Sequence, residues 1–398
     1  MSASFKIASS TSIGGRTTQE DRIVVVPDLN VHVPAGRRSA LDPPTKRSFF
    51  AVFDGHGGQD CSDFLSSRFH VELAENPLLE SDPKAALLDV WDSMDGKFYE
   101  TCNQKRIAER LAARANRTDE SGKDKIDKQR ASATTIDEFK ASFPVDGSTA
   151  TVVLIVGNKL FVANCGDSAG VLVRKDGSVK TLTEDHGTLN PLEVERVRRS
   201  GGGIKEQVIS VGRRFPLCCV SHTVVVGKPR AYPGGLLVTR AFGNFYSKVA
   251  ALGGTPGVII ADCEGVLEMA VGDDWSEVII ASDGVWDVLP TFLVPQILAQ
   301  LERTTGPGAG GGSDEPSWKS EQTPSEEKVA NGIHENDGQG AKRRLDQTCL
   351  NSKCARLVLS CVRHKHWREH QAVPDNTSVI ILQFEDTGNT SVTPAARG

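Results

Sequence analysis

Short apolar segments separated by tight turns restrict the possible folds of this chain more than any other feature. Residues 148–156 and 159–164 are two such segments, and the two-residue turn Gly157-Asn158 between them is typical of a β-hairpin. Another turn leads into the apolar run 171–173, which is followed by an Asp-Gly turn. Strands that follow one another through such short connections pair with their neighbours, so the sequence predicts antiparallel sheet.

Other apolar runs stop at polar residues and are expected to be strands, at residues 23–26, 48–53, 236–240, 277–281 and 377–384. Helices are expected where apolar residues recur at helical spacing, at about 60–73, 84–113, 191–199, 293–303 and 355–362. Residues 114–140 are charged and are interpreted either as an extension of the second helix or as a mobile insertion. Strands joined mostly by hairpins and flanked by helices predict a layered α+β domain.

The domain organisation follows from the polar stretches of the chain. Its 398 residues would allow two or three domains, but these stretches are typical of insertions into one. Residues 304–344 are rich in Gly, Ser, Glu and Lys and have little to bury, so they are expected to be disordered. Residues 204–234 are expected to be irregular and to belong to a flap at 187–235. The whole chain, 1–398, is expected to be a single domain with its core at about 6–303 and 345–385.

Charge and cysteine content exclude several classes of function. The formal net charge of −5 is too small to argue for nucleic acid or an anionic membrane as a partner. Nine cysteines, an odd number without CxxC pairs, are typical of free thiols in a reducing compartment, here the cytoplasm, the nucleus or both. The chain has no apolar run long enough to span a membrane. We expect a monomer without nucleic-acid or membrane partners.

Acidic residues stand where the expected strands begin or end. Glu20 and Asp21 precede one strand, Asp54 and Asp283 each end a strand, and Asp375 begins the last strand. If these strand ends meet at the rims of the sheets, several carboxylates converge in one cleft. Repulsion between them would then force some to stay protonated, unless divalent cations neutralise them.

The residues around these acids point to a particular metal and reaction. All candidate ligands are oxygen donors, accompanied by a single histidine, His56, and such sites suit Mg²⁺ or Mn²⁺. Gly55 permits close approach of the backbone, so its carbonyl can also ligate. Two such ions lower the pKa of a bridging water and neutralise a phosphoryl group. Arg16 can clamp a phosphate, and His56 can donate a proton to the leaving oxygen.

Each of these residues also has a simpler interpretation. Asp-Gly pairs are common in turns, a lone arginine is usually solvated, and a lone histidine more often belongs to a loop or core. The arginines of the expected helix 191–199, Arg196, Arg198 and Arg199, are interpreted as a solvated face rather than a substrate-binding one. His366 and His370, one helical turn apart, can bind zinc, but the glutamate of a zinc protease motif is missing.

Taken in order, the motifs resemble those of the type 2C (PPM) family of metal-dependent protein serine/threonine phosphatases. The similarity covers the chain from about Lys6 to Phe384. It is carried by RTTQED at 16–21, FFAVFDGHGG at 49–58, DGSTATVVL at 146–154, VANCGDS at 162–168, GGLLVTRAFGN at 234–244, VIIASDGVWDVL at 278–289 and PDNTSVIIL at 374–382. DGHGG, SDGVWDVL and DNTSVI are specific to the family when they occur together.

The resemblance implies a fold and a set of metal ligands. The fold is a four-layer α-β-β-α sandwich, in which two stacked antiparallel sheets are flanked by helices and the active site lies between the sheets. Asp54 would bridge two metal ions, Mg²⁺ or Mn²⁺, and Gly55 would ligate through its carbonyl. Glu20, Asp283 and Asp375 match the remaining ligands of the two-metal centre.

The resemblance also assigns roles around the metals. Asp21 matches a residue that binds a metal-bound water, Arg16 matches the phosphate-binding arginine, and His56 matches the general acid. The implied substrates are phosphorylated proteins that carry phosphoserine or phosphothreonine. In the family, water attacks in line and no phosphoenzyme forms.

A few positions depart from the family pattern. Ala169 stands where members often have arginine, and Asn244 stands where many have aspartate. A third metal in some members is held by an aspartate where this chain has Pro144, and Asp146, directly before Gly147, is the acid nearest to that position. None of these changes removes a ligand of the two-metal centre. A catalytically inactive scaffold with the same fold, and a phosphatase of small phosphoesters, stay open as alternatives.

Overall fold

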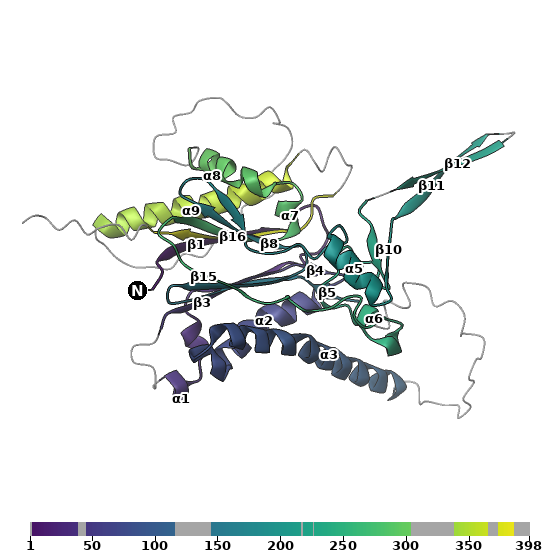
Figure 1. Ribbon diagram of the computed structural model, residues 1–398, viewed down its shortest axis with the longest axis horizontal. Helices are drawn as coiled ribbons and strands as arrows, with labels where there is room; N and C mark the ends of the chain where they lie inside the picture. The colour runs from purple at the N-terminus through teal and green to yellow at the C-terminus, as the bar shows by residue number, and fades with distance from the viewer. Residues whose placement is uncertain are drawn as a thin grey trace, which may run out of the picture.

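The chain forms two stacked antiparallel sheets covered by helices on both outer faces (Figure 1). This computed structural model describes residues 2–38, 45–115, 145–215, 218–225, 227–303, 338–364 and 373–385. One sheet has the order β1 (Phe5–Ser12), β17 (Thr377–Phe384), β16 (Trp275–Ala281), β8 (Ala169–Arg174) and β9 (Val179–Thr181). The other has the order β15 (Leu267–Ala270), β7 (Lys159–Cys165), β6 (Ala150–Val156), β3 (Arg47–Phe53) and β2 (Arg22–Val26).

Helices complete the four layers that the resemblance implied. α2 (Asp60–Glu75) and α3 (Pro83–Ala115) lie on the β3 sheet, and α8 (Val294–Arg303) and α9 (Gly338–Val362) lie on the β16 sheet (Figure 1). The shorter helices are η1 (Leu29–His32), α1 (Ala35–Arg38), η2 (Pro77–Glu80), α5 (Pro191–Arg199), α6 (Phe245–Lys248), η3 (Ala250–Leu252), α7 (Asp283–Trp286) and η4 (Thr291–Leu293). The predicted α+β class with antiparallel sheets is confirmed, and the helices and sheets lie in the order expected for an α-β-β-α sandwich (Figure 1).

Strand β3 shows how the sequence produces these layers. All seven of its residues are buried, and successive side chains point to opposite faces of the strand. Phe49 and Phe53 pack with α2 and α3, whereas Phe50 and Val52 pack against the opposite sheet. A strand buried on both faces reads as an unbroken apolar run.

Three segments differ from the sequence-based expectation. Residues 204–234 are not irregular: their Val- and Ile-rich runs pair with each other. β10 (Gly203–Lys205) pairs with β13 (Arg230–Tyr232), and β11 (Val208–Phe215) pairs with β12 (Cys218–Val225) in a hairpin that projects from the body of the molecule (Figure 1). Residues 236–240 are not a regular strand, because their bridges go to three different segments rather than to one neighbour. β1 was not predicted, since its polar alternation gives a weak apolar signal.

The predicted insertions fall largely outside the described residues. This is true of 116–144, which includes most of the charged stretch 114–140, and of 304–337. The last part of the predicted disordered insertion, from Gly338 to residue 344, is instead the first part of α9, a helix that continues into a buried face beside α8. Among the described helices, none is long and apolar enough to cross a bilayer.

Candidate active site

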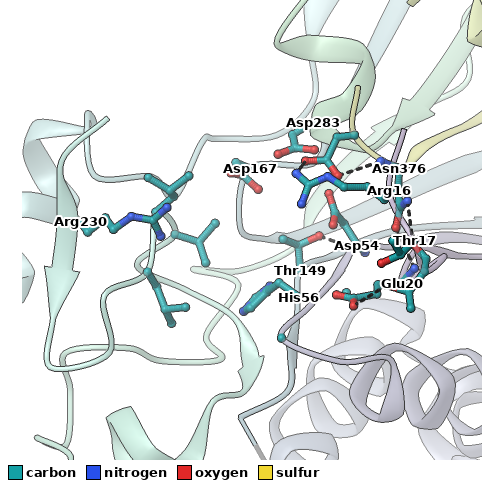
Figure 2. A pocket seen from close by; sticks show the side chains of 17 residues that line it. Arg16, Thr17, Glu20, Asp54, His56, Thr149, Asp167, Arg230, Asp283 and Asn376 are labelled. Carbon is teal, nitrogen blue, oxygen red and sulfur yellow. Dashed lines mark hydrogen bonds and ion pairs between the residues drawn. The ribbon is translucent and has the colours of Figure 1, made fainter. Parts of the chain in front are cut away.

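The ends of the central strands enclose a cavity of about 320 Å³. Its walls come from both sheets, from the loop before β2 and from the segment after β13. Every predicted site residue except Asp21 lines it, namely Arg16, Glu20, Asp54, Gly55, His56, Asp283 and Asp375. Figure 2 shows Arg16, Asp54, Asp167 and Asp283 facing a common space, with Arg230 on the far side. Residues far apart in the chain therefore converge as the strand ends predicted.

Buried carboxyl groups crowd this cavity. Asp54 follows β3, and burial, then the charges of Asp21 and Asp283, raise its pKa well above the ordinary value. Asp283 begins α7, and burial followed by the charges of Asp167 and Asp375 raises its pKa in the same way. Both shifts arise because a charged carboxylate loses hydration on burial and is repelled by its neighbours. The site therefore favours a bound cation or a bound proton.

Asp21 lies behind the cavity wall rather than in it. Its side chain is buried, and the Ser282 hydroxyl donates a hydrogen bond of 2.9 Å to Oδ2. Oδ1 is buried without a hydrogen-bond partner among the described residues. Burial raises the pKa of Asp21 to about 6, although hydrogen bonds from Ser378 and Ser282 act in the opposite direction. This placement is compatible with the predicted contact to a metal-bound water.

Asn376 was missed by the sequence reasoning, although it lies within the quoted motif PDNTSVIIL. Its Nδ2 donates to the carbonyl oxygens of Ile13 at 3.0 Å and Thr18 at 3.1 Å. Its Oδ1 accepts from the backbone N–H of Glu20 at 2.8 Å. Asn376 thus ties the loop that carries Arg16 and Glu20 to the start of β17, next to Asp375.

Arg16 is paired with a predicted metal ligand. Its Nη2 lies 2.5 Å from Oδ2 of Asp375, and the two side chains are 51% and 31% exposed. Exposed ion pairs contribute little to stability, so this contact can give way to a doubly charged phosphate. The role of Arg16 as a phosphate clamp stays a prediction.

The His56 side chain is hydrogen-bonded to Asn244. Its Nε2 lies 2.8 Å from Oδ1 of Asn244, at the small sheet formed by β14 (Phe242–Gly243), β5 (Gly147–Ser148) and β4 (Gly55–His56). Burial lowers the pKa of His56, while the Asn244 hydrogen bond and the charge of Glu20 oppose that shift. The ring lines the same cavity as the carboxylates, as a proton donor to a bound ester would have to.

Three further cavity residues were not singled out from the sequence. Asp167 follows β7, and burial together with the charge of Asp185 raises its pKa to about 7. Like Asp54, it follows a buried strand, but in the sequence the Gly-Asp pair was interpreted as an ordinary turn. Thr149 is bonded to Asp54 in both directions, through its N–H at 2.8 Å and its hydroxyl at 3.3 Å. Arg230 comes from β13 and donates to the Gly235 carbonyl at 2.8 Å.

Asp146, the acid nearest to the position that holds a third metal in some family members, does not line the cavity. Its carboxylate lies against Gly58, where a Cβ atom would come within 2.3 Å of Oδ1. Burial and the charge of Asp60 raise the pKa of Asp146 to about 6. The acid therefore sits beside the DGHGG loop but outside the main cavity.

The donor set fits hard divalent cations. The cavity acids offer only oxygen atoms, and several of them are buried without a compensating positive charge. Within the described part of the chain, no three His, Cys, Asp or Glu side chains are already grouped as a cage around one point. Mg²⁺ or Mn²⁺ would relieve the mutual repulsion of the cavity acids.

Comparison with known proteins settles the family. Residues 6–307 match the family profile described as "Protein phosphatase 2C". The chain belongs to the protein phosphatase 2C family. "Probable protein phosphatase 2C 16" of Oryza sativa subsp. japonica is 30% identical over 248 residues, which are 62% of this chain and 45% of that protein. "Probable protein phosphatase 2C 21" of the same plant is 29% identical over 295 residues, 74% of this chain and 73% of that protein.

Solved structures agree with the fold of this 2C-family chain. The "serine-threonine phosphatase 2C from Toxoplasma gondii" superposes with a TM-score of 0.59 at 18% identity, covering 97% of this chain and 98% of that one. A "C.elegans sex determining protein" gives a TM-score of 0.53 at 19% identity, covering 96% and 64%. Sequence identities of 18% and 19% support a common fold and nothing more specific. This chain also spans less than half the length of several relatives, 45%, 36% and 48% of three rice proteins.

Proposed function

We propose that this chain is a serine/threonine protein phosphatase that hydrolyses phosphoserine and phosphothreonine with water activated by two Mg²⁺ or Mn²⁺ ions. The observation that carries the proposal is the convergence of Glu20, Asp54, Asp283 and Asp375 in one cavity with Arg16 and His56. Phosphorylated proteins are the proposed partners. A cytoplasmic or nuclear location is proposed from the odd number of cysteines.

The carboxylates of Glu20, Asp54, Asp283 and Asp375 and the carbonyl of Gly55 would hold the ions. Bound there, the metals would lower the pKa of a water molecule and offset the charge of the phosphoryl group. Asp21, behind Asp54, would orient water at the site through its free Oδ1.

The remaining steps use the chain's own side chains. Arg16 would give up its contact with Asp375, bind two oxygens of the phosphoryl group and so orient that group. Water would attack phosphorus as the bond to the seryl or threonyl oxygen breaks, with the electron pair leaving on that oxygen. The attacking water would lose its proton to solvent, the leaving oxygen would gain one from His56, and His56 would then take a proton from solvent. The products are the free alcohol and inorganic phosphate.

The experiment is phosphate release from a phosphothreonine peptide with Mg²⁺, with Mn²⁺ and with a chelator. We predict metal-dependent activity in the wild type and a loss of at least roughly 10³-fold for Asp54→Asn or Asp283→Asn, because each removes a charge from the proposed metal centre. Asp176→Asn is the matched control, since this aspartate also belongs to an Asp-Gly turn but is exposed and outside the cavity.

The inactive-scaffold alternative predicts the opposite result. It would be favoured by loss of the acidic residues, and all of them are present. Wild-type protein that releases no phosphate with either metal, while still binding phosphoproteins, would overturn the phosphatase proposal.

A further inference from the structure

Gly147 lies between His56 and the segment that holds it. In the three-stranded sheet β14-β5-β4, Gly147 of the middle strand pairs with Gly243 on one side and with His56 on the other. Asn244 directly follows Gly243 and is completely buried. Its side chain must therefore reach across the middle strand to contact the histidine.

The absence of a side chain on Gly147 provides the path. A Cβ atom on this residue would come within 2.0 Å of Oδ1 of Asn244, and its three nearest heavy atoms would all belong to that amide group. The φ angle of Gly147 is not in the left-handed region, so other residues could adopt its backbone conformation. Glycine is needed here for space rather than for backbone torsion.

The orientation of the Asn244 amide is fixed by its other contacts. Nδ2 donates to the carbonyl oxygen of Val145 at 3.0 Å, and a carbonyl can only accept. Oδ1 must therefore face His56, where it can only accept from Nε2–H at 2.8 Å. The Asn244 backbone is held as well, because its N–H donates to the carbonyl of Asp146 at 2.7 Å and its φ of 51° is one that asparagine tolerates.

We propose that Asn244 is the positioning residue of His56: it crosses Gly147, holds the proton on Nε2 and reserves Nδ1 for the substrate. This inference rests on the proposed function, in which His56 protonates the leaving oxygen. The donated proton then comes from Nδ1 of the doubly protonated ring. After the transfer the ring keeps its Nε2 proton, still bonded to Asn244, and needs no rotation before the next turnover.

The first test compares two leaving groups. The alkoxide of phosphothreonine must be protonated as it leaves, whereas p-nitrophenolate is stable enough to leave unprotonated. For Asn244→Gly, which keeps the left-handed backbone, we predict a loss in kcat of at least about tenfold on a phosphothreonine peptide, because general-acid catalysis is typically worth about 10²–10⁴-fold. On p-nitrophenyl phosphate the loss should be less than about threefold, since no acid is required.

Two controls accompany this comparison. Asn244→Asp retains an oxygen that can accept from Nε2–H and should recover most of the peptide activity. Asn76→Gly removes another buried asparagine amide, which caps η2 outside the cavity, and should leave the ratio between the two substrates unchanged. Equal losses on both substrates for Asn244→Gly would overturn the positioning role.

The second test uses the steric relation between Gly147 and Asn244. Gly147→Ala should displace the amide, lower the temperature of unfolding and reproduce the leaving-group-dependent loss. In the Asn244→Gly background the amide group nearest to the added methyl is gone, so the same alanine should cost little further stability or activity. Additive effects in the double variant would show that the two residues do not share one contact.

The third test does not depend on activity. In protein labelled with ¹⁵N-histidine and kept above pH 8, the nitrogen shifts of His56, assigned with His56→Gln, should show the proton on Nε2. Asn244→Gly should give mixed tautomers. A proton on Nδ1 in the wild type would overturn the inference even if the enzyme is active, whereas an inactive wild type with the Nε2 proton would count against the proposed function alone.

Discussion

At the scale of single residues, several carboxyl groups in and beside the cavity favour the protonated form at pH values where they would be ionised in water. Burial raises the pKa of Asp54 well above its ordinary value, that of Asp21 to about 6 and that of Asp167 to about 7. In the unfolded chain these groups ionise near their ordinary pKa of 3.8. Between pH 4 and 7 the metal-free folded state therefore binds more protons than the unfolded state. Its stability must fall as the pH rises through that window.

This fall in stability with rising pH leads to a prediction for Asp54→Asn. Without metal, the variant should be more stable than the wild type at pH 7, by about 1–3 kcal/mol, because it removes a repelled buried charge. The difference should shrink towards pH 4, where Asp54 of the wild type is protonated. Urea denaturation in the presence of a chelator measures it. A variant that is less stable than the wild type at pH 7 would contradict the electrostatic account.

At the scale of elements, α5 is anchored by a buried ionic network that its sequence did not reveal. Arg198 and Arg199 are exposed as expected, but Arg196 turns inward and donates to Glu193 and to the carbonyl of Gly257 at 2.5 Å. Glu193 also accepts from Arg240 at 2.6 Å, and both of these side chains are 2% exposed. The interpretation of α5 as a wholly solvated basic face is therefore wrong for Arg196, which contacts Glu193 on the same helix and Gly257 in a distant segment.

Removing the acid at the centre of this network should destabilise the protein. Burial alone would raise the pKa of Glu193, but hydrogen bonds from Arg240, Arg196 and Thr239 lower it to about 2. Its contribution is therefore complete above about pH 4.5 and is lost as the pH falls towards 2. Glu193→Gln should cost about 3–5 kcal/mol at pH 7 in urea denaturation, because it leaves buried arginine charge uncompensated.

Glu195→Gln provides the matched comparison for this prediction. Glu195 lies on the same helix and pairs with Arg199, but both side chains are largely exposed. Such a pair is worth less than about 1 kcal/mol. Similar costs for the two glutamine variants would show that the buried network does not stabilise α5.

At the scale of the whole molecule, the sequence predicted the layers and the acidic cavity because both depend on local patterns. Asp54 and Asp283 adjoin buried apolar strands, so the strand ends marked them as candidates, and the family resemblance implied that they meet between the sheets. Asp167 was hidden by an ordinary Gly-Asp turn. Asn376 could not be assigned from spacing, because its partners Ile13 and Thr18 lie at the other end of the chain. The strands of 204–234 pair only with one another, and their Gly and Pro content suggested loops.

The interior position of β17 in its sheet gives a prediction on this scale. It pairs with β1 on one side and with β16 on the other, and Asp375 and Asn376 immediately precede it. A chain that ends at residue 376 should fail to unfold cooperatively on heating, because two strands lose their common neighbour. A chain that ends at Glu385 retains every described strand and should unfold like the full chain. Cooperative unfolding of the shorter chain would contradict this view of the sheet.

The place of β17 has a consequence for biosynthesis. Of the described strands, β1 is synthesised before all the others, and its partner β17 is synthesised after all the others. The β16 sheet cannot close, and Asn376 cannot bind the loop that carries Arg16 and Glu20, until β17 has been translated. The proposed activity should accordingly be absent from nascent chains until β17 has left the ribosome.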